Sequence, residues 1–223
     1  MDCRLIVFDV DGTLVDSQHL ILEAMQVAFD FLGETLPPRE TALSVVGLSL
    51  PEAFTALVGA HGPVEGLAAA YRDAFGRLRA DPAWHEPLFP GAADLVADLA
   101  GQDGVALGIA TGKSRRGVAH LVARHQWDRI FATVQTADGH PSKPHPSMLL
   151  AALAESGAAP GRAAMVGDTE YDIAMGRAAG MRTVGVTWGY HPSQRLVAAG
   201  ADVVIRDFAE LDAALAGLGL VAA

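Results

Sequence analysis

The residues best suited to chemistry stand directly after an apolar segment near the start of the chain. The stretch 4-RLIVFD-9 continues into 10-VDGT-13, which places Asp9 and Asp11 two positions apart. In an extended strand alternate side chains share a face, so both carboxylates can point to one site. In a dry site such a pair raises the pKa of one member unless a cation or a shared proton relieves the repulsion. The pair thus indicates a cation or acid–base site, although a solvated Asp-Gly turn has the same residues.

A second acidic motif, 166-VGDTEYDI-173, follows another apolar segment. Asp168 ends that segment, and Asp172 falls in the first turn of the helix predicted to follow. An aspartate at a helix N-terminus is favoured by the helix dipole alone, so Asp172 by itself is ambiguous. Asp168 is more informative, because it ends a predicted strand at the same sheet edge as Asp9.

Two further positions complete the set of candidate functional residues. Thr111, in 108-GIATGKS-114, ends a predicted strand, and its hydroxyl and the amides that follow can face an anion at the next helix N-terminus. Lys143, in 142-SKPHP-146, is one of only two lysines in the chain, the other being Lys113. Taken singly, each of these motifs is also typical of an ordinary turn or an exposed residue.

The elements that position these residues follow from hydrophobic periodicity. Short apolar segments rich in Val and Ile predict strands at 4–9, 104–111, 163–168, 182–188 and 202–205, with a weaker one at 131–136. Helical patterns lie between them, at 114–127, 146–157, 170–180 and 207–219. This alternation predicts an α/β fold with a doubly wound, mainly parallel, Rossmann-like sheet. Ligands of such folds bind at the carboxyl ends of the strands.

One long stretch interrupts the alternation of strands and helices. Between residues 16 and 87 the sequence shows only helical patterns, at 18–33, 38–47, 51–59 and 64–80, separated by proline and glycine. We therefore predict an all-helical insertion, residues 16–87, after the first strand. Residues 1–15 and 88–223 would form the α/β core.

The joint order of these motifs resembles the haloacid dehalogenase-like hydrolase superfamily. The matching residues are 9-DVDGT-13, Thr111, Lys143 and 167-GDTEYD-172, which span nearly the whole chain. The helical insertion between the first and second motifs is similar to the small cap of the phosphoglycolate phosphatase and phosphomutase branch.

The resemblance implies a phosphatase mechanism with an aspartyl-phosphate intermediate. Asp9 would be the nucleophile, and Asp11 would protonate the leaving alcohol and then activate water. Thr111 would bind a phosphoryl oxygen, and Lys143 would balance the crowded negative charge. It also implies Mg²⁺ as cofactor, held by Asp9, the backbone carbonyl of Asp11, Asp168 and, directly or through water, Asp172.

Substrate contacts are also expected from the resemblance and from the predicted cap. The candidates are the turns beside the phosphoryl group and the cap segment 46-VGLSLPEAF-54, together with one arginine: Gly12, Thr13, Gly112, Gly47, Leu48 and Arg72. Arg72 could meet a substrate carboxylate. The cap segment holds no run of Lys or Arg, which favours a small phosphomonoester, such as 2-phosphoglycolate or a sugar phosphate, over a polyphosphate.

The motif residues also bear on alternatives within and beyond the family. Asp11 argues against a dehalogenase, which has no phosphate leaving group to protonate. Thr13 favours a phosphatase over a phosphomutase, because mutases of this branch commonly carry Val or Ile there. A pyrophosphatase and a catalytically inactive phosphate-binding protein remain open.

The overall composition restricts the partners. The 223 residues are 51% hydrophobic and carry a formal net charge of -10, which argues against binding to nucleic acid or an anionic membrane. The single cysteine, Cys3, rules out a disulfide within the chain. No signal peptide and no apolar stretch of ~20 residues is seen. We expect a cytoplasmic protein that acts on a small phosphorylated metabolite; the sequence does not indicate its oligomeric state.

Overall fold

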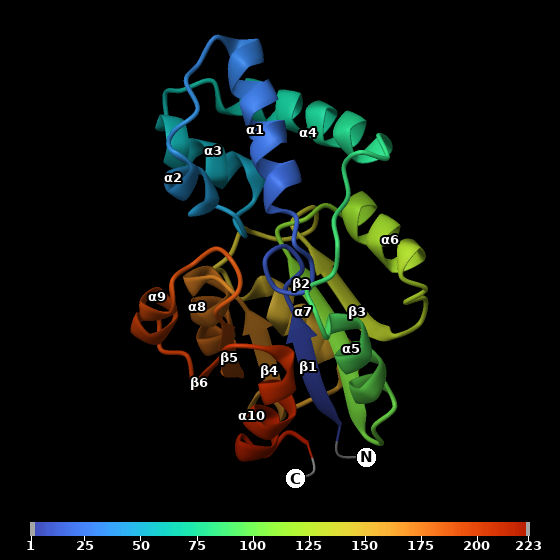
Figure 1. The fold of residues 1–223 in the computed structure, drawn as a ribbon. Helices are drawn as coiled ribbons and strands as arrows, with labels where there is room; N and C mark the ends of the chain where they lie inside the picture. Colours follow the sequence, from blue (N-terminus) through green and yellow to red (C-terminus); the bar gives the residue numbers. More distant parts are fainter. Residues whose placement is uncertain (1–2, 222–223) are drawn as a thin grey trace.

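A computed structural model describes residues 3–221 and shows a parallel sheet beneath a helical cap (Figure 1). The six strands lie in the order β3-β2-β1-β4-β5-β6, and every neighbouring pair is parallel. Their bounds are β1 Arg4–Phe8, β2 Val105–Thr111, β3 Phe131–Thr136, β4 Ala163–Gly167, β5 Arg182–Val186 and β6 Val203–Ile205. The chain order reverses between β1 and β4, which is where ligands bind in such sheets. The predicted doubly wound fold is confirmed.

Both faces of the sheet are covered, which explains the nearly continuous apolar strands. Along β1, Ile6 and Phe8 join one hydrophobic cluster and Leu5 and Val7 join another, as the two-residue period requires. The first cluster includes residues of α5 (Ala92–Ala100), α6 (Arg115–Arg124) and α10 (Leu211–Gly217). The second includes residues of α7 (Ser147–Ser156) and α8 (Glu170–Ala178). A short helix, α9 (Ser193–Ala198), and the 3₁₀ turns η1 (Pro160–Arg162) and η2 (Phe208–Glu210) complete the core.

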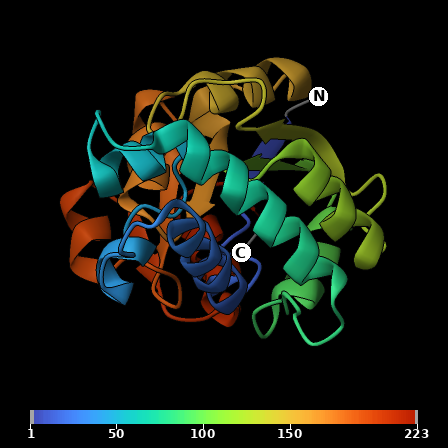
Figure 2. The same cartoon turned by 90° about the horizontal axis from the view of Figure 1, so that it is seen from above.

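The cap consists of four helices around a hydrophobic core of their own. They are α1 (Gln18–Leu32), α2 (Arg39–Leu43), α3 (Leu50–Val58) and α4 (Val64–Ala80). Phe29, Phe54 and Leu67 are fully buried among them. Figures 1 and 2 show the cap lying over the carboxyl ends of the strands. The helical character predicted for this stretch agrees with the structure, whereas the domain boundaries proposed at 15/16 and 87/88 stay an interpretation.

Two linkers that run side by side connect the cap to the sheet. The amide of Asp16 donates to the carbonyl of Pro87 over 2.8 Å, and the amide of Phe89 donates to the carbonyl of Leu14 over 2.9 Å. These bonds bring the acidic turn after β1 next to residues that lie far along the chain.

Within residues 3–221, no helix combines the length and the hydrophobicity that crossing a membrane requires. The cytoplasmic location expected from the sequence stays a prediction.

Candidate active site

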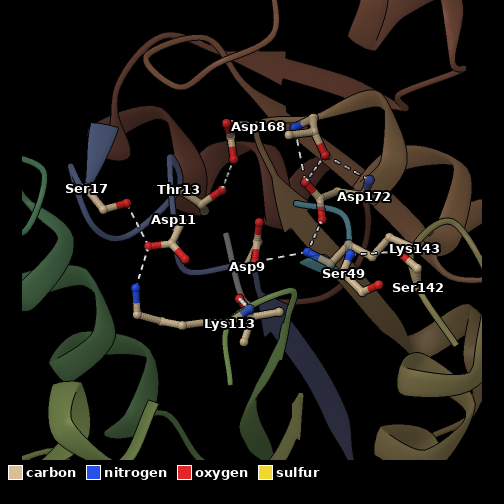
Figure 3. Close-up of polar contacts among 12 residues, drawn as sticks. Asp9, Asp11, Thr13, Ser17, Ser49, Lys113, Ser142, Lys143, Asp168 and Asp172 are labelled. Atoms are coloured by element: carbon tan, nitrogen blue, oxygen red, sulfur yellow. Dashed lines mark hydrogen bonds and ion pairs between the residues drawn. The ribbon is translucent and has the colours of Figure 1, made fainter. Parts of the chain in front are cut away.

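Three aspartates form a buried cluster at the carboxyl edge of the sheet (Figure 3). Asp9 follows β1, Asp168 follows the neighbouring strand β4, and Asp172 lies in the first turn of α8. Each offers an oxygen, and the three oxygens lie within 4.8 Å of one another. All three residues are at most 1% exposed. The structure thus brings together the two acidic motifs that lie far apart in the sequence.

Local hydrogen bonds orient two of these carboxylates. The Thr13 hydroxyl donates to Asp168 Oδ1 over 2.9 Å, and the Tyr190 amide donates to Asp168 Oδ2 over 2.8 Å. Asp172 Oδ2 accepts from the amide and the hydroxyl of Thr169, at 3.1 and 2.6 Å. Because the Thr169 hydroxyl in turn accepts from the Asp172 amide, the two residues form a capping box that begins α8.

Lys143 is the cation of this cluster. Its Nζ lies 2.9 Å from Asp9 Oδ1 and 2.7 Å from Asp172 Oδ1, and its side chain is fully buried. One lysine cannot neutralise three carboxylates. Asp9 Oδ2 is also buried and has no hydrogen-bond partner among the described residues.

The electrostatics of the cluster favour a bound cation. Burial raises the pKa of Asp9 to about 7; the charge of Lys143 opposes this rise and that of Asp172 adds to it. Burial, with the charges of Asp172 and Asp9, also raises the pKa of Asp168 well above its usual value. A divalent cation would relieve the repulsion, and a set of oxygen donors alone suits Mg²⁺. The unpartnered oxygen of Asp9 fits such an ion.

The Asp11 carboxylate lies outside this cluster. Its Oδ1 accepts from the Ser17 hydroxyl and from Lys113 Nζ, both over 2.7 Å (Figure 3). Lys113 Nζ also lies 2.8 Å from Glu86 Oε1. The predicted metal contact of Asp11 involves its backbone carbonyl and stays a prediction.

Sequence reasoning assigned no role to Lys113 or Glu86. The one available signal was the rarity of lysine together with the place of Lys113 directly after 111-TG-112. Nothing in the local pattern singles out Glu86.

A cavity of about 600 Å³ separates the cap from the core, a size typical of small-molecule sites. Many of the predicted residues line it, namely Asp9, Asp11, Gly47, Leu48, Arg72, Thr111 and Gly112. Gly12 and Thr13 are not among its lining residues. Gly12 has φ +86°, and a Cβ there would lie 2.3 Å from Asp168 Oδ2, so glycine is needed for packing against that aspartate. A role of Gly12 and Thr13 in substrate binding stays a prediction.

The cap segment around Gly47 packs directly against the core. A Cβ on Gly112 would lie 2.7 Å from the Gly47 carbonyl oxygen and 2.8 Å from that of Leu48. The Ser49 amide donates to Ser142 Oγ over 2.8 Å. The cavity is therefore closed by backbone contact along this side.

Four basic residues from separate segments line the cavity: Arg72 and Arg79 of α4, Lys113 after β2, and Arg116 of α6. The basic residues around the cavity therefore come from outside the cap segment, and the preference for a small phosphomonoester drawn from that segment stays a prediction. The acidic Glu52 and Asp138 line the same cavity.

Trp188 and Tyr190 are not among the lining residues of this cavity and pack beside the aspartates. Trp188 Nε1 donates to the Thr13 carbonyl over 3.0 Å.

A family model described as haloacid dehalogenase-like hydrolase matches residues 6–186. The chain belongs to this family. The curated relatives of this hydrolase include a protein named "Probable phosphatase IndB" from Dickeya dadantii, 37% identical over 93% of this chain and 91% of the relative. A pyrophosphatase, PpaX of Anoxybacillus flavithermus, is 31% identical over 95% and 96% of the two chains. A phosphoglycolate phosphatase of Pseudomonas fluorescens is 31% identical over 93% and 78%.

A solved structure agrees with this assignment. A haloacid dehalogenase-like family hydrolase from Streptococcus pneumoniae superposes with a TM-score of 0.82 at 25% identity, covering 96% of this chain and 99% of the other. The predicted family is confirmed, and the protein is a phosphatase hydrolase of this family.

Proposed function

We propose that this phosphatase uses Mg²⁺ to hydrolyse a small phosphomonoester, such as phosphoglycolate or a sugar phosphate, through an aspartyl-phosphate. The observation that carries the proposal is the buried, unpartnered oxygen of Asp9, which lines the cavity beside two further carboxylates and Lys143. An oxygen in that position can serve as a nucleophile or a metal ligand, and the pair of Asp9 oxygens allows both.

The ion would be held by Asp9, Asp168, the Asp11 carbonyl and, directly or through water, Asp172. When bound, Mg²⁺ supplies positive charge that offsets repulsion between the Asp9 carboxylate and the phosphoryl oxygens. Lys143 adds a fixed positive charge beside Asp9.

The chemistry follows from two carboxylates with different surroundings. An Asp9 oxygen bonds to phosphorus while the ester P–O bond breaks, and Asp11 gives its proton to the departing oxygen. Asp11 then takes a proton from water as the water oxygen bonds to phosphorus, the acyl phosphate bond breaks, and phosphate leaves with Asp9 restored. Thr111, which lines the cavity, would bind a phosphoryl oxygen.

The test is hydrolysis of p-nitrophenyl phosphate and of a panel of natural phosphate esters ranked by kcat/KM. We expect activity with Mg²⁺, none with EDTA, and a loss of at least about 10³-fold in Asp9→Asn. Asp73→Asn is the matched control, because Asp73 is exposed and pairs with Arg77 on the surface of the cap. Near-normal turnover by Asp9→Asn would show that another group is the nucleophile.

Pyrophosphate is a second candidate substrate. The basic groups of Arg72, Arg79 and Arg116 can hold a second phosphoryl group, and one relative is a pyrophosphatase. A kcat/KM for pyrophosphate above that of every ester in the panel would favour this substrate. The same panel separates a phosphomutase, which would yield isomers without free phosphate, and an inactive binding protein, which would bind without turnover.

A further inference from the structure

We propose that Lys113, anchored by Glu86, is a positioning residue that orients the Asp11 carboxylate for proton transfer to the leaving group. The inference rests on the proposed function, in which Asp11 is the general acid. It concerns two residues that act through Asp11 rather than on the substrate.

The two oxygens of Asp11 have different surroundings. Oδ1 accepts two hydrogen bonds, from Ser17 Oγ and Lys113 Nζ, each 2.7 Å long. Oδ2 has no hydrogen-bond partner among residues 3–221, and Asp11 lines the cavity. With Oδ1 anchored on one side, the carboxylate cannot rotate freely, and Oδ2 is the oxygen left to meet a leaving group (Figure 3).

Lys113 is itself immobilised, which an exposed lysine would not be. Its Nζ lies 2.8 Å from Glu86 Oε1 and 5.1 Å from the centre of the Phe75 ring, and its side chain is only 8% exposed. A Cβ on Gly117 would lie 2.8 Å from Lys113 Cγ, so the aliphatic part of the lysine packs against the backbone of α6. Fixing a long side chain costs conformational entropy, and these contacts offset that cost before any substrate binds.

Glu86 supplies the anchor from the second linker between cap and core. It is 7% exposed, and its carboxylate shares the Lys113 ammonium with Asp11. Without Glu86, the ammonium would keep its bond to Asp11 but lose the partner that fixes its direction. Glu86 therefore affects the orientation of Asp11 indirectly, through Lys113.

The experiment compares two aryl esters with the same phosphoryl group and no other charge, whose leaving groups differ in basicity. Phenyl phosphate needs a proton on its departing oxygen far more than p-nitrophenyl phosphate does. In Lys113→Met we expect kcat/KM for phenyl phosphate to fall by about tenfold or more, against less than about threefold for p-nitrophenyl phosphate. The ratio between the substrates does not depend on the fraction of protein that is folded.

Two further variants complete the design. Glu86→Gln should change the ratio in the same direction by a smaller factor, and Arg77→Met, an exposed charge on α4, should leave it unchanged. An unchanged ratio in Lys113→Met, with equal losses on both esters, would overturn the inference and show that Lys113 binds the shared phosphoryl group or supports the fold. If the ratio changed in Lys113→Met but not in Glu86→Gln, Glu86 would have no part in orienting Asp11.

Failure of the inference is distinguishable from failure of the proposed function. If the wild-type protein hydrolyses neither aryl ester nor any member of the substrate panel, the proposed function fails and this inference fails with it. If the wild-type protein is active and the ratio does not respond to Lys113→Met, only the positioning role fails.

Discussion

Lys143 shows how one side chain can decide the electrostatics of a site. Burial alone would lower its pKa, but the carboxylates of Asp172 and Asp9 outweigh burial, and the pKa is raised. The lysine therefore stays charged at every pH at which the enzyme is expected to work. Its removal would leave two buried carboxylates without their cation.

Replacing Lys143 should thus affect stability as well as activity. We expect Lys143→Met in EDTA to lower the free energy of unfolding by about 3 kcal/mol, because one partner of a buried ion pair is lost. Urea denaturation followed by circular dichroism measures this, with Arg77→Met as an exposed control expected within about 0.5 kcal/mol of the wild type. Equal stabilities of the two variants would contradict the account.

Thr13 could support a metal ligand or bind substrate, and its substitution separates these two roles. Its hydroxyl donates to Asp168 Oδ1 over 2.9 Å, so it supports a proposed metal ligand, whereas the sequence suggested substrate binding. We expect Thr13→Val to weaken Mg²⁺ binding by roughly tenfold, as loss of a ligand's hydrogen-bond partner commonly does. A titration of activity against Mg²⁺ tests this. A raised KM for substrate with unchanged Mg²⁺ dependence would support the substrate role instead.

At the scale of elements, the contact between the cap segment and the loop after β2 closes one side of the cavity. Gly112 leaves no room for a Cβ beneath the carbonyl oxygens of Gly47 and Leu48, which are backbone atoms and cannot move cheaply. This contact explains the glycine at position 112 without invoking a bond to substrate.

Gly112→Ala should push the cap segment away from the core. We expect kcat/KM to fall by about tenfold, because misplaced site residues lose orientation. Gly139→Ala is the matched control, since a Cβ there meets nothing within 4 Å. Steady-state kinetics of both variants on p-nitrophenyl phosphate provides the measurement. If Gly112→Ala kept wild-type kinetics, close contact between the cap segment and Gly112 would not be needed for activity.

Sequence patterns predicted some elements better than others. The strands and the cap helices were predicted because their periodicity is strong over a sufficient length. α5 and α9 were not predicted: nine residues rich in alanine and six residues after a turn carry too little periodicity to stand out. The expected helix at 207–219 is divided into η2 and the shorter α10.

At the scale of the whole molecule, the acidic chain concentrates part of its positive charge around one cavity. The net charge is -10, yet four of its 16 basic residues line the space between cap and core, together with four acidic ones, Asp9, Asp11, Glu52 and Asp138. The cavity is therefore less negative than the chain as a whole, and charges on the distant surface are largely screened from it by salt.

Stability should depend jointly on pH and Mg²⁺. Because burial raises the pKa of Asp9 from 3.8 to about 7, the folded state binds more protons, and the metal-free protein loses stability as pH rises between those values. Mg²⁺ requires the ionised carboxylates, so it binds more tightly at higher pH. We expect the rise in Tm on adding Mg²⁺ to be larger at pH 8 than at pH 5.5. Thermal melts with Mg²⁺ or EDTA measure it; a rise independent of pH would contradict the electrostatic account.

The sequence by itself determined the fold class and the meeting of Asp9 with Asp168. Both follow from local features, because apolar periodicity marks strands and parallel strands bring their carboxyl ends to one edge. Only the tertiary structure decided which side chains surround Asp11 and how the cap closes the cavity. Lys113 lies 102 positions from Asp11 and 27 from Glu86, and the cap meets Gly112 through backbone atoms. Such contacts depend on the packing of distant segments, which no local pattern of residues records.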